Sequence, residues 1–259
     1  MDEMIQENGR LGERWDIKGR IALVTGASKR LGRAIALDLA CRGARIAAHC
    51  ASSLDAAEDL AGKIRQNGGT CQIFPADFDC PENAGELVRR VAASMGTVSI
   101  LINNASIFDE QSFREMSLPE IERNLRINAW APMEAARAMA ATCEDGVIIN
   151  LLDTRVLDYD RTHVPYHLSK RMLATLNRIM ALEFAPRIRV NAIAPGLVLP
   201  PEGKDDSYLA ALAPSVPLQT WGGTQDIVDA AIYLIQARFV TGQTLYVDGG
   251  RHMKGHVYE

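Results

Sequence analysis

The sequence lacks a membrane-length apolar run, clustered cysteines and a basic tract. No run approaches about 18 apolar residues, and residues 1–16 are polar where a signal peptide would need an apolar stretch. The five cysteines are scattered without a Cys-x-x-Cys pair, which argues against a disulfide framework or a zinc knuckle. The formal net charge is −4, so nucleic acid is not an expected partner. We expect a cytoplasmic protein that contacts neither membrane nor nucleic acid.

What the sequence does contain indicates one folded domain. The chain has 259 residues, of which 47% are hydrophobic and 23% charged, and such a chain can bury a substantial core. Residues 1–15 show no periodicity and are expected to form a flexible tail. No repeat, low-complexity tract or linker divides the remainder. We therefore predict a single domain over 16–259.

Short β-rich apolar runs alternate with longer helical patterns along the chain. Parallel strands joined by helices are covered on both faces, and they are apolar along their length, as in IALVT and VSILI. The pattern predicts a doubly wound α/β fold, with one parallel sheet of about seven strands and helices on both faces. The predicted strands are Ile21–Thr25, Arg45–His49, Thr70–Pro75, Val98–Asn103, Gly146–Leu151, Ile188–Ile193 and Thr244–Val247.

One long stretch, from Pro195 to about Gly223, shows neither pattern. It holds five of the eleven prolines. An irregular segment of this length inside a compact domain is usually a lid or a binding loop. We predict that about 196–223 form a lid over a substrate.

A glycine turn follows the first predicted strand. The chain reads Gly26-Ala-Ser-Lys-Arg-Leu-Gly32, and a helical pattern over Arg33–Ala40 comes next. In a strand, glycine turn and helix, backbone N–H groups and the positive helix end can meet the phosphates of a dinucleotide. This order predicts a dinucleotide site after the first strand.

From this turn to the C-terminus the sequence resembles the short-chain dehydrogenase/reductase family, whose fold is of the Rossmann type. Thr25, Gly26 and Gly32 match the family's glycine turn, with Arg30 in place of its middle glycine. Further family motifs are matched, in order, by Asn103-Asn104-Ala105, Asn128, Tyr166-His-Leu-Ser-Lys170, Pro195-Gly196, Gly242 and Val247-Asp248-Gly249-Gly250.

The end of the second predicted strand favours NADPH as the cofactor. An acidic residue there binds the ribose 2′-hydroxyl and would repel a 2′-phosphate, but the chain reads His49-Cys-Ala-Ser-Ser53. Lys29 can meet the phosphate charge, or it is an ordinary solvated lysine. The resemblance implies cofactor contacts from Gly26, Lys29, Arg30, Leu31, Gly32, Ser52, Ser53, Asp77, Asn104, Ala105, Ser106, Tyr166, Lys170, Pro195 and Gly196.

Tyr166 and Lys170 are the expected catalytic pair. They are four residues apart at the start of a predicted helix, so they share one face. A nearby ammonium favours the phenolate and lowers the tyrosine pKa from about 10 towards neutrality. The resemblance implies that Lys170 also holds the nicotinamide ribose and that Asn128 anchors a water chain.

Asp153 occupies the position where most of the family places a serine. A carboxylate there would repel the oxyanion that builds up when a ketone is reduced. An acid is useful when a C=N bond is reduced, because the nitrogen then needs a proton. Asp153 therefore predicts an imine substrate.

Within the family, the sequence resembles the pteridine reductase subgroup. Lys29-Arg-Leu-Gly32, Ser106 in Asn-Asn-Ala-Ser, and Phe108 match that subgroup. The likeness implies that Phe108 stacks on the pterin; alternatively Phe108 is a hydrophobic anchor of its loop. The implied substrate contacts are Arg30, Ser106, Phe108, Asp153, Tyr166 and Leu199.

The first functional hypothesis is NADPH-dependent reduction of a dihydropterin, such as dihydrobiopterin, dihydromonapterin or dihydrofolate, to the tetrahydropterin. A second is a carbonyl reductase acting on a 3-oxoacyl thioester, sugar or steroid, and a third is a pterin-sensing protein with little turnover. His163 and His167 are four apart but lack a third ligand, so we expect no metal. The resemblance implies a homotetramer.

Overall fold

The structure is a computed structural model that describes residues 14–159, 161–201 and 203–254. At its centre is a parallel sheet with the strand order β3-β2-β1-β4-β5-β6-β7. The strands are β1 (Ile21–Val24), β2 (Arg45–Cys50), β3 (Thr70–Pro75), β4 (Val98–Asn103), β5 (Gly146–Leu151), β6 (Ile188–Pro195) and β7 (Thr244–Val247). The predicted doubly wound α/β fold is confirmed, with β1 one residue shorter than expected and β2 and β6 slightly longer.

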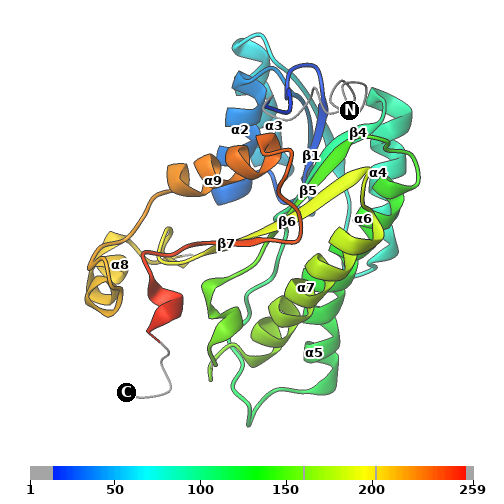
Figure 1. Cartoon of the computed structure of the whole chain (residues 1–259). Coiled ribbons are helices and arrows are strands. Elements are labelled where there is room, and N and C mark those ends of the chain that lie inside the picture. Colours follow the sequence, from blue (N-terminus) through cyan, green and yellow to red (C-terminus); the bar gives the residue numbers. More distant parts are fainter. Residues whose placement is uncertain (1–13, 160, 202, 255–259) are drawn as a thin grey trace, which may run out of the picture.

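Helices cover both faces of the sheet (Figure 1). One face carries α2 (Arg30–Cys41), α3 (Leu54–Gln66) and α9 (Thr224–Gln236). The other face carries α4 (Glu82–Met95), α6 (Ala131–Ala140) and α7 (Val164–Glu183), and α5 (Leu118–Leu125) packs on α7. Within the described ranges, no helix combines the length and the apolar character that crossing a membrane requires.

The continuous apolar strands result from this arrangement. In β4, Ile100 and Ile102 belong to the core under α2, α3 and α9, whereas Leu101 between them belongs to the core under α4 and α6. Successive side chains of a strand point to opposite faces, so every position of a doubly covered strand is buried.

The order of the strands reverses between β1 and β4, which are neighbours in the sheet. Ligands of open α/β sheets bind at such a switch point, in the crevice beyond the carboxyl ends of the strands. The glycine turn follows β1 and Asn104 follows β4, so both predicted motifs lie at this crevice.

The flexible tail predicted over residues 1–15 extends too far along the chain, because the fold already includes Trp15. Residues 1–13 lie outside the described residues, but Trp15 is 1% exposed within the core. Its indole Nε1 donates hydrogen bonds of 2.9 and 3.0 Å to the Asp145 carboxylate, and its backbone N–H donates to Gln236 O at 3.0 Å. Trp15 is therefore part of the folded domain.

The predicted lid is not irregular throughout. It contains α8 (Asp206–Leu212) and a 3₁₀ turn, η3 (Ala213–Ser215). Asp205 begins α8, because its carboxylate accepts the Ser207 N–H at 3.0 Å. Leu197, Leu209 and Val216 bury a small apolar cluster of their own. The prolines of this stretch therefore flank a short helix rather than exclude one.

Candidate active site

The glycine turn after β1 is closely packed. Gly26 has a φ of +62°, a conformation that L side chains rarely adopt. A Cβ on Gly32 would lie 2.3 Å from Gly26 O and 2.6 Å from the Asn104 amide nitrogen. Glycine is therefore required at both positions if this turn is to keep its shape.

Arg30 has a φ of +53° at the position where the family carries its middle glycine. A bulky residue in the left-handed region is strained by roughly 1–3 kcal/mol, which the surrounding structure has to offset. The Arg30 guanidinium donates to Pro200 O at 2.7 Å. Arg30 thus connects the glycine turn to the loop after β6 that carries Leu199.

The turn is also bonded to the end of β4. The Thr25 hydroxyl accepts the backbone N–H groups of Asn104 and Ala105 at 2.9 and 3.0 Å. The Asn104 side-chain amide donates to Thr25 O and Gly26 O at 2.9 and 3.1 Å. These bonds fix the two predicted cofactor segments relative to each other.

His49, at the end of β2, holds the turn from the other side, and sequence reasoning gave it no role. Gly26 N–H donates to His49 Nδ1 at 3.0 Å, so the ring is neutral and its Nε2–H donates to Ala76 O at 3.0 Å. The ring stacks on Phe78 with centroids 4.3 Å apart. Burial, helped by the charge of Arg90, lowers the pKa of His49 to about 4.

The remaining predicted cofactor residues surround this crevice. Lys29 is exposed and occupies the N-cap position of α2 without a side-chain hydrogen bond, and Leu31 follows it in the first turn. Ser52 is exposed after β2, and Ser53 begins α3 without a side-chain cap. Asp77 is exposed after β3, and its carboxylate accepts the Asp79 N–H at 2.9 Å. The glycine cradle and the acid-free end of β2 fit a dinucleotide that carries a 2′-phosphate.

Tyr166, Lys170 and Asp153 are brought together as predicted. The Tyr166 hydroxyl donates to Asp153 Oδ2 at 3.1 Å. The other oxygen of Asp153 accepts the Arg155 N–H at 2.8 Å, so the carboxylate also caps the 3₁₀ turn η2 (Thr154–Leu157). Two hydrogen bonds therefore hold the Asp153 carboxylate against the tyrosine.

Lys170 is buried beneath this pair. Its ammonium donates to Leu151 O at 2.7 Å and lies 5.6 Å from the centre of the Tyr166 ring. Burial lowers the pKa of Lys170 to about 8, although the negative charge of Asp153 acts in the opposite direction. At neutral pH Lys170 is therefore protonated in most molecules, and its positive charge lies next to the phenol.

Asn128 lies in a π-helical turn, η1 (Arg126–Trp130), between α5 and α6. Such turns inside α-helices are frequent at functional sites. Its side chain accepts the Ile107 N–H at 2.9 Å and donates to Ile107 O at 3.0 Å, and it also donates to the Ser169 hydroxyl at 3.0 Å. Asn128 therefore holds the chain after β4 against α7.

Phe108 is thereby placed next to Tyr166. The neighbouring Gln111 forms a β-bridge to His163, which begins α7. The Phe108 ring stacks on His163 with centroids 4.0 Å apart and meets Tyr166 edge-on at 4.6 Å. Phe108 is 44% exposed, and a ligand that stacks on it has to use the surface that His163 leaves or displace His163. Ser106, just before this segment, is exposed.

Pro195 and Gly196 end β6 beside β7. The Gly196 N–H donates to Val247 O at 2.9 Å, and a Cβ on Gly196 would lie 2.6 Å from the Asp248 Cα. Gly196 therefore permits the close approach of these two segments. The half-buried Leu199 lies in the loop that follows.

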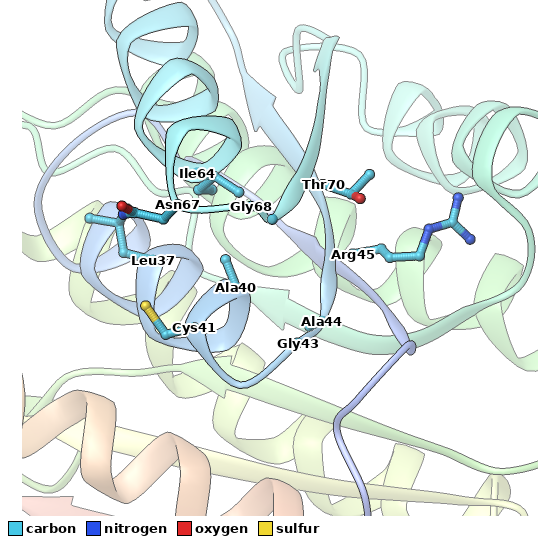
Figure 2. A pocket seen from close by; sticks show the side chains of 11 residues that line it. Leu37, Ala40, Cys41, Gly43, Ala44, Arg45, Ile64, Asn67, Gly68 and Thr70 are labelled. Carbon is cyan, nitrogen blue, oxygen red and sulfur yellow. The ribbon is translucent and has the colours of Figure 1, made fainter.

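A cavity of about 300 Å³ lies elsewhere, where α2 and α3 end and β2 and β3 begin. Figure 2 shows Leu37, Ala40 and Cys41 lining it, with the Arg45 side chain pointing away. It is at the amino ends of the strands, opposite the predicted site. Among the described residues, no three His, Cys, Asp or Glu side chains are grouped to hold a metal.

Comparisons with known proteins agree with this geometry. The parallel order of the sheet and the glycine turn at its switch point define a dinucleotide-binding fold of the Rossmann type. A family model described as enoyl-(acyl carrier protein) reductase matches residues 26–252. The chain belongs to the short-chain dehydrogenase/reductase family of oxidoreductases, which confirms the resemblance seen in the sequence.

Individual relatives carry several different names. The chain is 33% identical over 246 residues to 3beta-hydroxysteroid dehydrogenase 1 of Eggerthella lenta, covering 91% of this chain and 94% of the relative. Among solved structures it is similar to FolM alternative dihydrofolate reductase 1 of Brucella canis, complexed with NADP, with a TM-score of 0.88, 32% identity and coverage of 94% and 97%. The same protein from Brucella suis, also with NADP, gives a TM-score of 0.87, 33% identity and coverage of 95% and 98%.

Proposed function

We propose that this protein is an NADPH-dependent reductase that acts on the C=N bond of a dihydropterin and forms the tetrahydropterin. The observation that carries the proposal is the hydrogen bond from the Tyr166 hydroxyl to the Asp153 carboxylate. A ketone reductase needs that hydroxyl to donate to a carbonyl oxygen that becomes negatively charged, and a carboxylate beside this oxygen would repel it. The likeness to the two dihydrofolate reductases supports the same substrate class.

NADPH is the cofactor that the residues of the chain fit. The close packing of Gly26 and Gly32 leaves the start of α2 open to a pyrophosphate. Lys29, Ser52 and Ser53 offer a cation and two hydroxyls where a carboxylate would exclude the 2′-phosphate. When bound, NADPH supplies the hydride for the ring carbon.

The residues of the chain supply and control the proton. Reduction of the C=N bond adds a hydride to carbon and a proton to nitrogen, so the nitrogen needs a donor within hydrogen-bond reach. Tyr166 and Asp153 share a hydrogen bond, so either group can pass a proton to the other and the pair can deliver one to the ring nitrogen. The buried ammonium of Lys170 stabilises negative charge left on the phenol.

Substitution of Asp153 tests this proposal. We expect Asp153→Asn, which keeps the size of the side chain and its ability to cap η2, to lower kcat for dihydrobiopterin by roughly 10²- to 10⁴-fold. Asp153→Ser should do the same while keeping or improving reduction of an acetoacetyl thioester. Asp229→Asn, which removes an exposed carboxylate on α9, is the control and should change neither rate.

The measurement is steady-state NADPH oxidation against dihydrobiopterin, dihydrofolate and the thioester. The proposal is wrong if the wild-type protein reduces the thioester but no dihydropterin. Comparable turnover of dihydrobiopterin by the wild type and Asp153→Asn would remove the carboxylate from the mechanism.

Carbonyl reduction is the second candidate, because the chain is similar over most of its length to a relative whose name is that of a hydroxysteroid dehydrogenase. The intact Tyr166 and Lys170 pair would serve such a reaction, whereas Asp153 opposes it. The homotetramer and the cytoplasmic location expected from the sequence stay predictions.

A further inference from the structure

Arg251 is a buried arginine whose guanidinium finds no acceptor among the described residues. It begins the 3₁₀ turn η4 (Arg251–Met253) after β7 and is 9% exposed. Its Nε is fully enclosed, and the guanidinium makes no hydrogen bond or ion pair with any residue in the described part of the chain. By contrast, the guanidinium of the half-buried Arg189 donates to three backbone carbonyls at 2.6–2.8 Å.

Hydrogen bonds fix η4 next to the catalytic carboxylate. The Asp248 carboxylate accepts the N–H groups of Gly250 and His252 at 3.0 and 2.8 Å, and it also accepts the Thr154 hydroxyl at 2.5 Å. Thr154 directly follows the catalytic aspartate, and η2 packs against η4. The C-terminal turn therefore lies beside the segment after β5, as Figure 1 shows. The main chain at Arg251 is thus held at the catalytic end of the sheet.

Ionisable groups from the site and from the lid act electrostatically on the guanidinium. Burial lowers the pKa of Arg251, and the positive charge of Arg155 adds to this effect. Asp153, Tyr208 and Asp158 act on Arg251 in the opposite direction, so all three are within electrostatic range of its guanidinium. Tyr208 belongs to α8, so Arg251 lies within electrostatic range both of the catalytic carboxylate and of a residue of the lid helix.

The buried Nε of Arg251 is unfavourable as it stands, because it has lost its hydration and no hydrogen bond within the described part of the chain replaces it. A ligand that carries an anionic group removes this deficit. The planar fork of N–H donors matches the oxygens of a phosphate or a carboxylate, and hydrogen bonds between ionised partners are strong.

We propose that Arg251 forms a subsite for an anionic group on the side chain of the substrate. This proposal rests on the proposed function, because the substrate is taken to be a dihydropterin. The side chain of such a pterin is attached to the ring carbon that takes the hydride, next to the nitrogen that takes the proton. A short side chain ending in phosphate or carboxylate therefore extends from the vicinity of Asp153, where Arg251 lies.

Two substrates that differ by a single phosphate group provide the test. Dihydroneopterin and its 3′-monophosphate share the ring and the side-chain carbons, and dihydrofolate provides a carboxylate on a longer arm. We would measure kcat/KM for each substrate with the wild type, Arg251→Met, Arg251→Lys and Arg178→Met. Arg178 is an exposed arginine on α7, so its loss controls for net charge alone.

The readout is the ratio of kcat/KM for the phosphate ester to that for dihydroneopterin. We expect Arg251→Met to lower this ratio about 10- to 100-fold, the size of one lost hydrogen bond to a charged group. Arg251→Lys should retain part of the wild-type ratio, and Arg178→Met should leave the ratio unchanged. A matching loss with dihydrofolate would identify carboxylate as the group bound, and a loss with the phosphate ester alone would identify phosphate.

The possible failures are distinguishable. If the wild type reduces dihydropterins and Arg251→Met leaves the ratio unchanged, the subsite is wrong and the proposed function stands. If the wild type reduces no dihydropterin, both are overturned. Should Arg251→Met fail to fold, the wild type alone provides the test. Its kcat/KM should be higher for the phosphate ester than for dihydroneopterin at low salt, and this difference should shrink as salt rises. Equal kcat/KM values at every salt concentration would overturn the subsite.

Discussion

The neutral state of His49 predicts a specific loss of stability in mild acid. The folded pKa of about 4 lies below the unfolded value of 6.5, so the unfolded chain binds the proton first as pH falls. The contribution of His49 is therefore complete above pH 6.5 and is lost as pH falls from 6.5 to 4. From these values we expect a loss of about 2 kcal/mol at pH 5 and about 3 kcal/mol at pH 4.

Variants isolate this effect from other groups. His49→Asn and His49→Phe remove the titrating ring, and the phenylalanine keeps a flat ring against Phe78. Both variants are expected to be less stable at pH 7, because the Gly26 N–H loses its partner ring nitrogen. Their stability should nevertheless fall by about 2 kcal/mol less than that of the wild type between pH 7 and pH 5.

The assay is urea unfolding at pH 7, 6, 5.5 and 5, at one protein concentration so that any assembly contributes equally. Carboxyl groups titrate near pH 4 and contribute mainly below this window. Equal losses in the wild type and in both variants would show that His49 is not held neutral by the fold. The bond to Gly26 would then need another explanation.

Two further predictions concern packing. Gly32→Ala should abolish NADPH binding in a fluorescence titration, because the added Cβ would lie 2.3 Å from Gly26 O. Gly62→Ala is the control: the Cβ added to this α3 residue meets nothing within 4 Å. This variant should bind NADPH normally and be about 0.5–1 kcal/mol more stable than the wild type. Trp15→Ala should lower the free energy of unfolding in urea by about 3–5 kcal/mol, because it removes a fully buried indole. A decrease below about 1 kcal/mol would show that Trp15 belongs to the flexible tail and not to the folded domain.

Patterns that repeat along the chain can be recognised in the sequence alone. The apolar runs predicted every strand, because a doubly covered strand is apolar at each position. The spacing of Tyr166 and Lys170 predicted their common helical face, and the structure places both beside Asp153. The short helix α8 was missed, although Asp205 offers the signal of an N-cap.

Contacts between distant segments cannot be recognised in this way. His49 meets Gly26 and Ala76 across three strand ends, and Phe108 meets His163 through a bridge that only the folded chain forms. No local pattern marks such partners, since their separation in sequence carries no periodic signal.

The sequence by itself determined the class of fold, the position of the glycine turn and the residue types of the candidate catalytic group, because each depends on local pattern and spacing. Only the tertiary structure decided which side chains lack or find a partner. It gave His49 two hydrogen bonds and a neutral ring, and it left Arg251 buried without an acceptor among the residues that the structure describes. The reason is physical: burial and hydrogen bonding depend on what packs around a group, and that is fixed only when remote parts of the chain meet.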